Sequence, residues 1–171
     1  MRTTMKAAGS AVAIFAMVGQ ALAAGCARPD EAMALKTAAM QQQLMVAALY
    51  CNDVAPYNRF VVSHQRELQD SDAELLHYFQ HGHGGATAYH SYKTGLANDF
   101  SLSGLHGMAS FCANANAAFD AASQSRGTLA QFMATQRVRG TEAYPSCETA
   151  QADGGDMVAG GATRLAASRR N

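Results

Sequence analysis

Apolar residues recur at three- and four-residue intervals along most of the chain, which is the spacing typical of amphipathic helices. The first long segment of this kind begins at Pro29, where a proline and two acidic residues favour a helix N-terminus. It continues to Cys51 without an internal glycine or proline. We therefore expect a first helix over residues 29–51. Its apolar face consists of Met33, Thr37, Met40, Leu44, Ala48 and Cys51.

A second long helix is expected from Pro56 to the glycine-rich turn at residues 81–85. Its apolar face consists of Tyr57, Phe60, Val61, His64, Leu68, Leu75 and Phe79. Ser71 and Glu74 have the spacing of an internal capping box. We therefore expect a kink just before them, near residues 69–70.

A third long helix is expected over residues 86–119, with a weak point at residues 101–104. Its apolar face consists of Tyr89, Tyr92, Leu96, Leu105, Met108, Phe111, Cys112, Ala115 and Phe119. A short fourth helix begins at Thr128, which is spaced to form a capping box with Gln131. After it, the chain is expected to be extended over residues 141–146.

The sequence thus predicts an all-α fold, an antiparallel bundle of three long helices plus one short helix, because short connections make successive helices antiparallel. The 171 residues are enough for one domain with a core but hardly for two. The bundle domain is expected over residues 24–147. Residues 148–171 are rich in Gly, Ala, Asp and Arg and contain few apolar anchors, so we expect a disordered C-terminal tail.

The N-terminal segment, residues 1–23, is typical of a secretory signal peptide. Arg2 and Lys6 precede an apolar run over residues 7–18, and Ala21-Leu22-Ala23 supplies small residues at the positions that signal peptidase recognises. The run is shorter than the roughly 20 residues that span a bilayer, so no transmembrane segment is expected in the mature chain. We expect a periplasmic or secreted protein, with a lipoprotein acylated at Cys26 as the minor alternative.

Four cysteines, Cys26, Cys51, Cys112 and Cys147, follow the predicted signal peptide. An even number in an exported chain favours disulfides, and no Cys-x-x-Cys pair supports a zinc site. A first helix about 33 Å long keeps Cys26 and Cys51 apart, which leaves two pairings. Folding the long helices antiparallel brings Cys112 beside Cys51 and returns Cys147 to Cys26. We therefore expect the disulfides Cys51–Cys112 and Cys26–Cys147.

Several short runs are specific enough to suggest a family: LMVAALYC at 44–51, YNRFV at 57–61, Tyr89, YKT at 92–94 and LAN at 96–98. Over about residues 26–115 the chain resembles a group of small exported bacterial proteins with the same order of cysteines and long helices. Some members bear the name S-adenosyl-L-homocysteine hydrolase. A dinucleotide-dependent hydrolase needs a glycine-rich turn in a βαβ unit, which this sequence does not contain. The resemblance therefore implies helices and export, and no mechanism.

His77, His81 and His83, with His90 beyond the turn, form a candidate metal site. His77 and His81 are four residues apart and share a helical face, and His83 is placed to complete a three-nitrogen site for zinc, copper or nickel. Histidines around a glycine-rich turn are more often simply exposed to solvent. We therefore expect no cofactor, with a metal at this turn as the alternative.

Two further polar groups are candidates for chemistry. His64 and Glu67 have the spacing of a base and its orienting acid, but no nucleophile lies at an evident spacing, so a structural pair is expected. Arg59, beside Asn58, is a candidate anion-binding residue, although a surface salt bridge is the commoner role. No catalytic residue is therefore expected.

Charge composition excludes one class of partner. The chain has 13 basic and 13 acidic residues, so no excess of positive charge indicates binding to nucleic acid. The sequence favours an exported, non-catalytic protein that binds another protein or an envelope component through a helical face or its tail. The alternative is a periplasmic metal-binding protein that uses the histidine turn.

Overall fold

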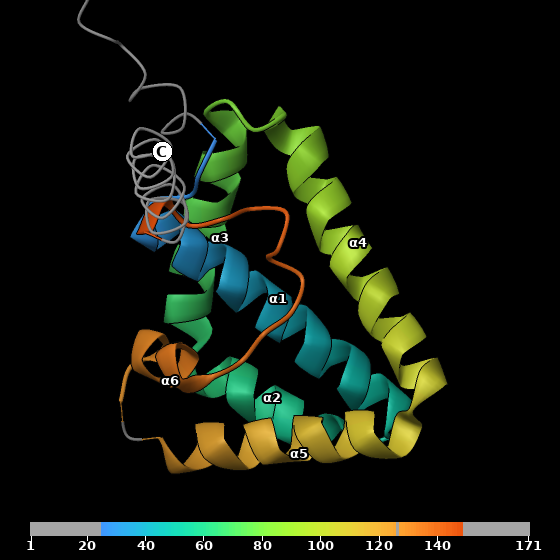
Figure 1. The fold of residues 1–171 in the computed structure, drawn as a ribbon. Helices are drawn as coiled ribbons and strands as arrows, with labels where there is room; N and C mark the ends of the chain where they lie inside the picture. The colour runs from blue at the N-terminus through green and yellow to red at the C-terminus, as the bar shows by residue number, and fades with distance from the viewer. Residues whose placement is uncertain (1–24, 126, 149–171) are drawn as a thin grey trace, which may run out of the picture.

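The computed structural model describes residues 25–125 and 127–148. Within these residues the chain folds into six helices and no strand, which confirms the predicted all-α fold (Figure 1). The helices are α1 (Pro29–Tyr50), α2 (Val54–Ser63), α3 (Gln65–Gln80), α4 (Gly85–His106), α5 (Met108–Gln124) and α6 (Leu129–Thr135). The predicted signal peptide and all but the first residue of the predicted tail lie outside the described residues.

Helix α1 is the centre of the fold. It begins at Pro29, as predicted, and the backbone N–H of Arg28 donates to the Glu31 carboxylate at 2.7 Å. It contacts each of the other five helices, and the consecutive residues 37–40 are all buried. The sequence predicts only one apolar face for this helix. The structure buries more because alanines around the helix allow its neighbours to approach closely from several sides.

The predicted second helix is two helices, and its break lies at His64, not near residues 69–70. His64 has φ −115° and ψ 19°, and its ring nitrogen Nδ1 lies 3.0 Å from Oε2 of Glu67. The change of direction lets Phe60 contact the ring of Phe132 on α6, with 6.2 Å between the ring centroids. Helix α3 then continues through Asp70 and Ser71 without interruption.

The predicted third helix is also two helices, and its break lies at Gly107, after the expected weak point. The hydroxyls of Ser101 and Ser103 donate to the carbonyls of Ala97 and Asp99, so the serines bond within α4 and do not end it. At Gly107 the backbone leaves the helical region, and α5 turns back to run along α2 (Figure 1). The described residues therefore form six helices where the sequence predicts three long ones and one short one, although the predicted all-α fold class is correct.

The C-terminal part of the described chain closes the fold. Thr128 caps the N-terminus of α6, and its hydroxyl accepts from the backbone N–H of Gln131 at 3.2 Å, as the capping-box spacing predicts. The chain then returns to the start of α1, where Ala27 and Ser146 form an isolated parallel bridge. Cys147 N–H donates to the Ala27 carbonyl at 2.9 Å.

The cysteines pair as the sequence analysis expects. Cys26 bonds to Cys147 with 4.9 Å between their Cα atoms, and Cys51 bonds to Cys112 with 5.8 Å. The first disulfide fastens the end of the described chain to the start of α1, and the second fastens the end of α1 to α5. Because stable disulfides form in oxidising compartments, these bonds point to an extracytoplasmic location. None of the described helices is long and apolar enough to cross a membrane.

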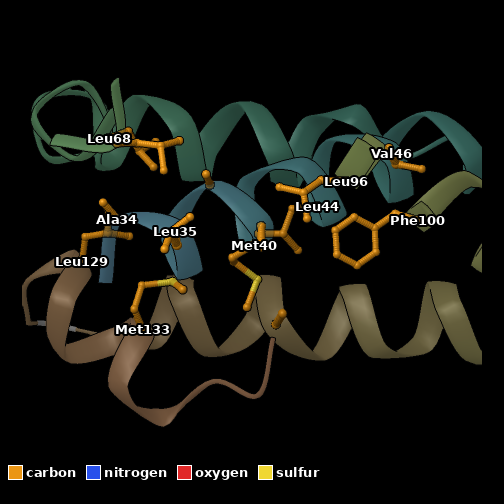
Figure 2. Close-up of a cluster of buried hydrophobic side chains, with 14 of the residues drawn as sticks. Ala34, Leu35, Met40, Leu44, Val46, Leu68, Leu96, Phe100, Leu129 and Met133 are labelled. Atoms are coloured by element: carbon orange, nitrogen blue, oxygen red, sulfur yellow. The ribbon is translucent and has the colours of Figure 1, made fainter. Parts of the chain in front are cut away.

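The hydrophobic core surrounds α1. Figure 2 shows Leu35, Met40 and Leu44 of α1 among side chains from neighbouring helices, including Phe100 of α4 and Met133 of α6. Leu35 and Leu44 are completely buried. Phe79 of α3 is equally buried and lies among tyrosine rings, described below. The core therefore holds α3, α4 and α6 against the central helix.

Polar contacts position α3 and α4 within this core. The Tyr89 hydroxyl and the Lys93 ammonium both donate to the Asp72 carboxylate, at 2.8 and 2.7 Å. The buried Tyr92 hydroxyl donates to the Leu35 carbonyl at 3.0 Å, and burial raises the pKa of Tyr92 well above its usual value. These hydrogen bonds place Tyr89 between α3 and α4 and Tyr92 between α4 and α1.

Candidate functional site

The ends of α1 and α4 and the start of α5 meet at one corner of the molecule (Figure 1). Exposed apolar side chains are concentrated on these helix ends and on the adjoining start of α2. Five of the six exposed large apolar residues in the described part of the chain belong to this region. We call these five the apolar corner: Leu49, Val54, Leu102, Leu105 and Met108. Leu105 is 66% exposed, although it lies on the predicted apolar face of the third helix. The break at Gly107 leaves it and Met108 without a covering neighbour.

The corner is held together by close contacts beneath it. Gly104 of α4 is buried between α1 and α5, and a Cβ atom placed there would lie 3.4 Å from ring carbons of both Tyr50 and Phe111. The disulfide Cys51–Cys112 joins the same two helices. Met108 lies one helical turn before Cys112 on the same face of α5. The exposed side chains of α1 and α5 therefore lie on helices that a disulfide joins covalently.

The charges around the corner are of both signs. Asp53 and Asp99 are exposed near the ends of α1 and α4. Exposed Arg59 lines a cleft with Asp53, and exposed Arg139 lines a pocket with Asp99. The charge near the corner therefore selects neither an acidic nor a basic partner.

A polar cleft of about 490 Å³ opens between α2 and α5. Helix α2 contributes residues three and four apart, and helix α5 does the same, so each helix turns one face toward the cleft. The polar side chains that line it, besides His64, are Asp53, Arg59, Ser63, Asn116, Asp120 and Ser123. This size is within the range of small-molecule sites in proteins.

At the end of α2 that borders the cleft, His64 and Glu67 form the hydrogen-bonded pair that the sequence predicts. The two oxygens of Glu67 have separate partners: Oε2 lies 3.0 Å from His64 Nδ1, and Oε1 accepts from the backbone N–H of Leu129 at 2.8 Å. Leu129 is the first residue of α6, whose early N–H groups have no partner within the helix. Glu67 therefore joins the α2–α3 break to the start of α6.

Replacing Glu67 with Gln is expected to lower the free energy of unfolding by about 1 kcal/mol at neutral pH. The loss is expected to be smaller at acidic pH. The hydrogen bond from His64 holds the pKa of Glu67 below its usual value, against the opposing effect of burial. A lowered pKa in the folded state means that this stabilisation is present above the unfolded pKa. It is lost as pH falls through the folded value. Urea unfolding at pH 6.5 and at decreasing pH measures the difference.

The matched control for this prediction is Asp70→Asn, which removes an exposed carboxylate from the same helix. We expect this control to change stability by less than about 0.5 kcal/mol at either pH. An equal loss for Glu67→Gln at all pH values would show that the charge of Glu67 has no part in the stabilisation.

The structure brings together two of the four histidines of the predicted metal site. The rings of His77 and His81 lie 4.0 Å apart between centroids, whereas His83 stacks on Tyr78 with 3.9 Å between centroids. His90 lies beyond the turn, on α4, and contacts the ring of Tyr89. Among the described residues no group of three or more His, Cys, Asp or Glu side chains is arranged to hold a metal ion. The candidate three-nitrogen arrangement is not formed among these residues, and His83 packs against Tyr78 instead.

Arg59 differs from its expected role. It is exposed beside the cleft, and no acidic side chain among the described residues forms an ion pair with it. Sequence reasoning identified Arg59 and His64 on α2, but it missed Asn116, Asp120 and Ser123 on α5. Their spacing could have shown from the sequence that they share one helical face. The packing of that face beside α2 could not be predicted, because it depends on the reversal of the chain at Gly107.

Comparisons with protein-family models, with curated proteins and with solved structures found no match to this chain.

Proposed function

We propose that this protein is an exported, non-catalytic binding protein and that the apolar corner docks another protein. The observation that supports this proposal is the concentration of exposed large apolar side chains at the corner. Soluble proteins rarely leave such groups together unless they bind a partner. The disulfide beneath the corner adds to the argument, because a surface that is already ordered loses little conformational freedom on binding.

The apolar side chains of the corner indicate the chemistry of the partner. The charges near the corner are of both signs, because exposed Arg59 lines the cleft with Asp53 and exposed Arg139 lines a pocket with Asp99. The complementary surface is therefore defined by its apolar side chains, as in the core of a protein–protein interface. A folded protein with an exposed apolar patch is the proposed partner.

The proposed location is the periplasm or the outside of the cell, after removal of residues 1–23. The two disulfides support an oxidising compartment, and the signal-peptide pattern supplies the route. Acylation at Cys26 requires a free thiol, and the bond from Cys26 to Cys147 occupies it. A mature protein without a lipid is consequently proposed.

The test compares the partner recovered with the wild-type protein and with Leu105→Glu in the exporting host, after identification by mass spectrometry. Leu105 is largely exposed, so this change leaves the core intact while placing a charge at the centre of the contact. We expect binding of the identified partner to fall at least about tenfold, equivalent to 1.4 kcal/mol. Unchanged affinity would contradict docking at the corner.

Val62→Glu is the matched control, because Val62 is a 74% exposed aliphatic residue on α2 outside the corner. We expect it to bind the partner as the wild type does. A partner that is lost equally with both variants would indicate a nonspecific response to added charge. A cross-linked or co-purified species of twice the chain's own mass would identify the partner as a second copy.

The alternative function, metal binding at the histidine turn, is favoured only by the proximity of His77 and His81. Two imidazoles need further ligands to hold zinc, copper or nickel tightly. Replacing both histidines with alanine separates the two proposals. Loss of a tightly bound metal would support the alternative, and retention of the partner by the same variant would support docking at the corner.

A further inference from the structure

The polar cleft between α2 and α5 is lined by a buried histidine, His64, and one nitrogen of its ring has no hydrogen-bond partner among the described residues. His64 is 8% exposed and lines the cleft. Its Nδ1 is engaged by Glu67, while Nε2 has no hydrogen-bond partner among the described residues. The only fully buried side-chain oxygen or nitrogen without a hydrogen bond in the described part of the chain is Glu74 Oε1, which pairs with Arg28 at 3.6 Å, so Nε2 of His64 is not fully buried. Nε2 of His64 is therefore reachable from the cleft.

Glu67 determines what Nε2 can do. An ionised carboxylate only accepts hydrogen bonds, so Nδ1 must carry the proton and donate to Oε2. In the neutral imidazole the other ring nitrogen then has no proton and is an acceptor. Glu67 on α3 thus fixes the tautomer of the neutral ring, in which Nε2 of His64 presents a hydrogen-bond acceptor to the cleft.

The remaining charges of the cleft are unevenly distributed. Asp53 and Asp120 provide two carboxylates, and Arg59 is the only lysine or arginine among the described residues that line the cleft. Together with Nε2 of His64, the carboxylates favour a ligand with a positively charged donor. Arg59 favours a carboxylate on the same ligand, because a guanidinium recognises that group with two parallel hydrogen bonds.

We propose that this cleft binds a small zwitterion, with its ammonium group received by Asp120, Asp53 and His64 and its carboxylate by Arg59. Free amino acids and short peptides have this chemistry. The cleft volume of about 490 Å³ accommodates a ligand of that size. This inference does not rest on the proposed docking, because none of the five side chains of the apolar corner lines the cleft.

The test is isothermal titration calorimetry of the intact, disulfide-bonded protein with the dipeptide Ala-Ala. N-acetyl-Ala-Ala lacks the ammonium group and Ala-Ala-amide lacks the carboxylate, so these two probes examine each end separately. We expect saturable binding of Ala-Ala at millimolar or lower concentration, and binding at least about tenfold weaker for each blocked peptide. Alanine as a third probe distinguishes a free amino acid from a peptide as the preferred size.

Two exposed residues of the cleft and two controls assign the ends of the ligand. Asp120→Asn is expected to abolish the preference for a free ammonium group, and Arg59→Gln the preference for a free carboxylate. Asp70→Asn and Arg66→Gln make the same chemical changes at exposed positions on α3 that do not line the cleft, and should bind as the wild type does.

Either of two results would overturn the inference. One is no saturable binding of Ala-Ala or alanine at millimolar concentration. The other is equal binding of free and blocked peptides, or equal effects of the cleft variants and the α3 controls. Because all four substitutions are at exposed positions, far-ultraviolet circular dichroism should show unchanged helix content and so exclude unfolding as the cause.

Discussion

Replacing Phe79 with Ala is expected to lower the free energy of unfolding by about 3–5 kcal/mol. Phe79 is completely buried on α3. Its ring contacts those of Tyr89, Tyr92 and Tyr144, at centroid distances of 6.4, 5.6 and 5.7 Å. The truncation therefore removes apolar area and leaves a cavity at the place where α3, α4 and the closing segment meet.

Urea unfolding followed by circular dichroism measures this loss, with Val62→Ala as the control. Val62 is 74% exposed, so its truncation should change stability by no more than about 0.5 kcal/mol. Phe79→Leu keeps most of the volume and is expected to cost less than Phe79→Ala, which preserves the test if the alanine variant does not fold. A loss below about 1 kcal/mol for Phe79→Ala would contradict the central position of this ring.

Removing either disulfide by a double Cys→Ser change is expected to cost about 2–4 kcal/mol. The bonds join residues 121 and 61 positions apart in the chain. Each restricts the unfolded chain, and the restriction grows only slowly with loop length, by about 0.6 kcal/mol for a doubling. We therefore expect losses of similar size, slightly larger for Cys26–Cys147.

The two double variants separate stability from docking. Both should unfold at lower denaturant concentration than the wild type, but only Cys51→Ser/Cys112→Ser should also weaken binding at the apolar corner. Single Cys→Ser variants are poor controls because each leaves a reactive thiol. No loss of stability from Cys26→Ser/Cys147→Ser would show that the return of residues 141–148 to α1 does not depend on the bond.

Local signals in the sequence were sufficient for much of the fold. Pro29 followed by two acids marked the start of α1, and the spacing of Thr128 and Gln131 marked the start of α6. These features act within one helical turn, so they can be recognised without knowing the neighbours. Helix length excluded a bond between Cys26 and Cys51, and the antiparallel order of the helices chose between the two remaining pairings.

The positions of the two helix breaks were not predictable in the same way. His64 ends α2 because its contacts with Glu67 and the position of Phe60 against Phe132 favour a change of direction, and Phe132 is distant in sequence. Gly107 was overlooked in favour of residues 101–104, whose serines bond back within the helix. At His64 tertiary contacts decide where the helix ends, whereas at Gly107 the glycine itself was a local signal.

These breaks explain why the candidate sites were largely missed. A continuous third helix would bury Leu105 and Met108 on its apolar face, and it would carry Asn116 and Asp120 away from α2. After the break at Gly107, Leu105 and Met108 are exposed. Asn116 and Asp120 instead line the cleft together with Arg59. The histidine turn, by contrast, was conspicuous in sequence, but the stacking of His83 on Tyr78 separates it from His77 and His81.

Site-specific photo-crosslinking from position 108 in the exporting host tests the proposed docking most directly. A photoreactive amino acid replaces Met108, which is 54% exposed at the apolar corner, and in a parallel sample it replaces Val62. We expect one defined protein to be cross-linked from position 108 and not from position 62, and Leu105→Glu to reduce its yield. Equal cross-linking from both positions, or none from position 108, would contradict the proposal that the apolar corner is a docking surface.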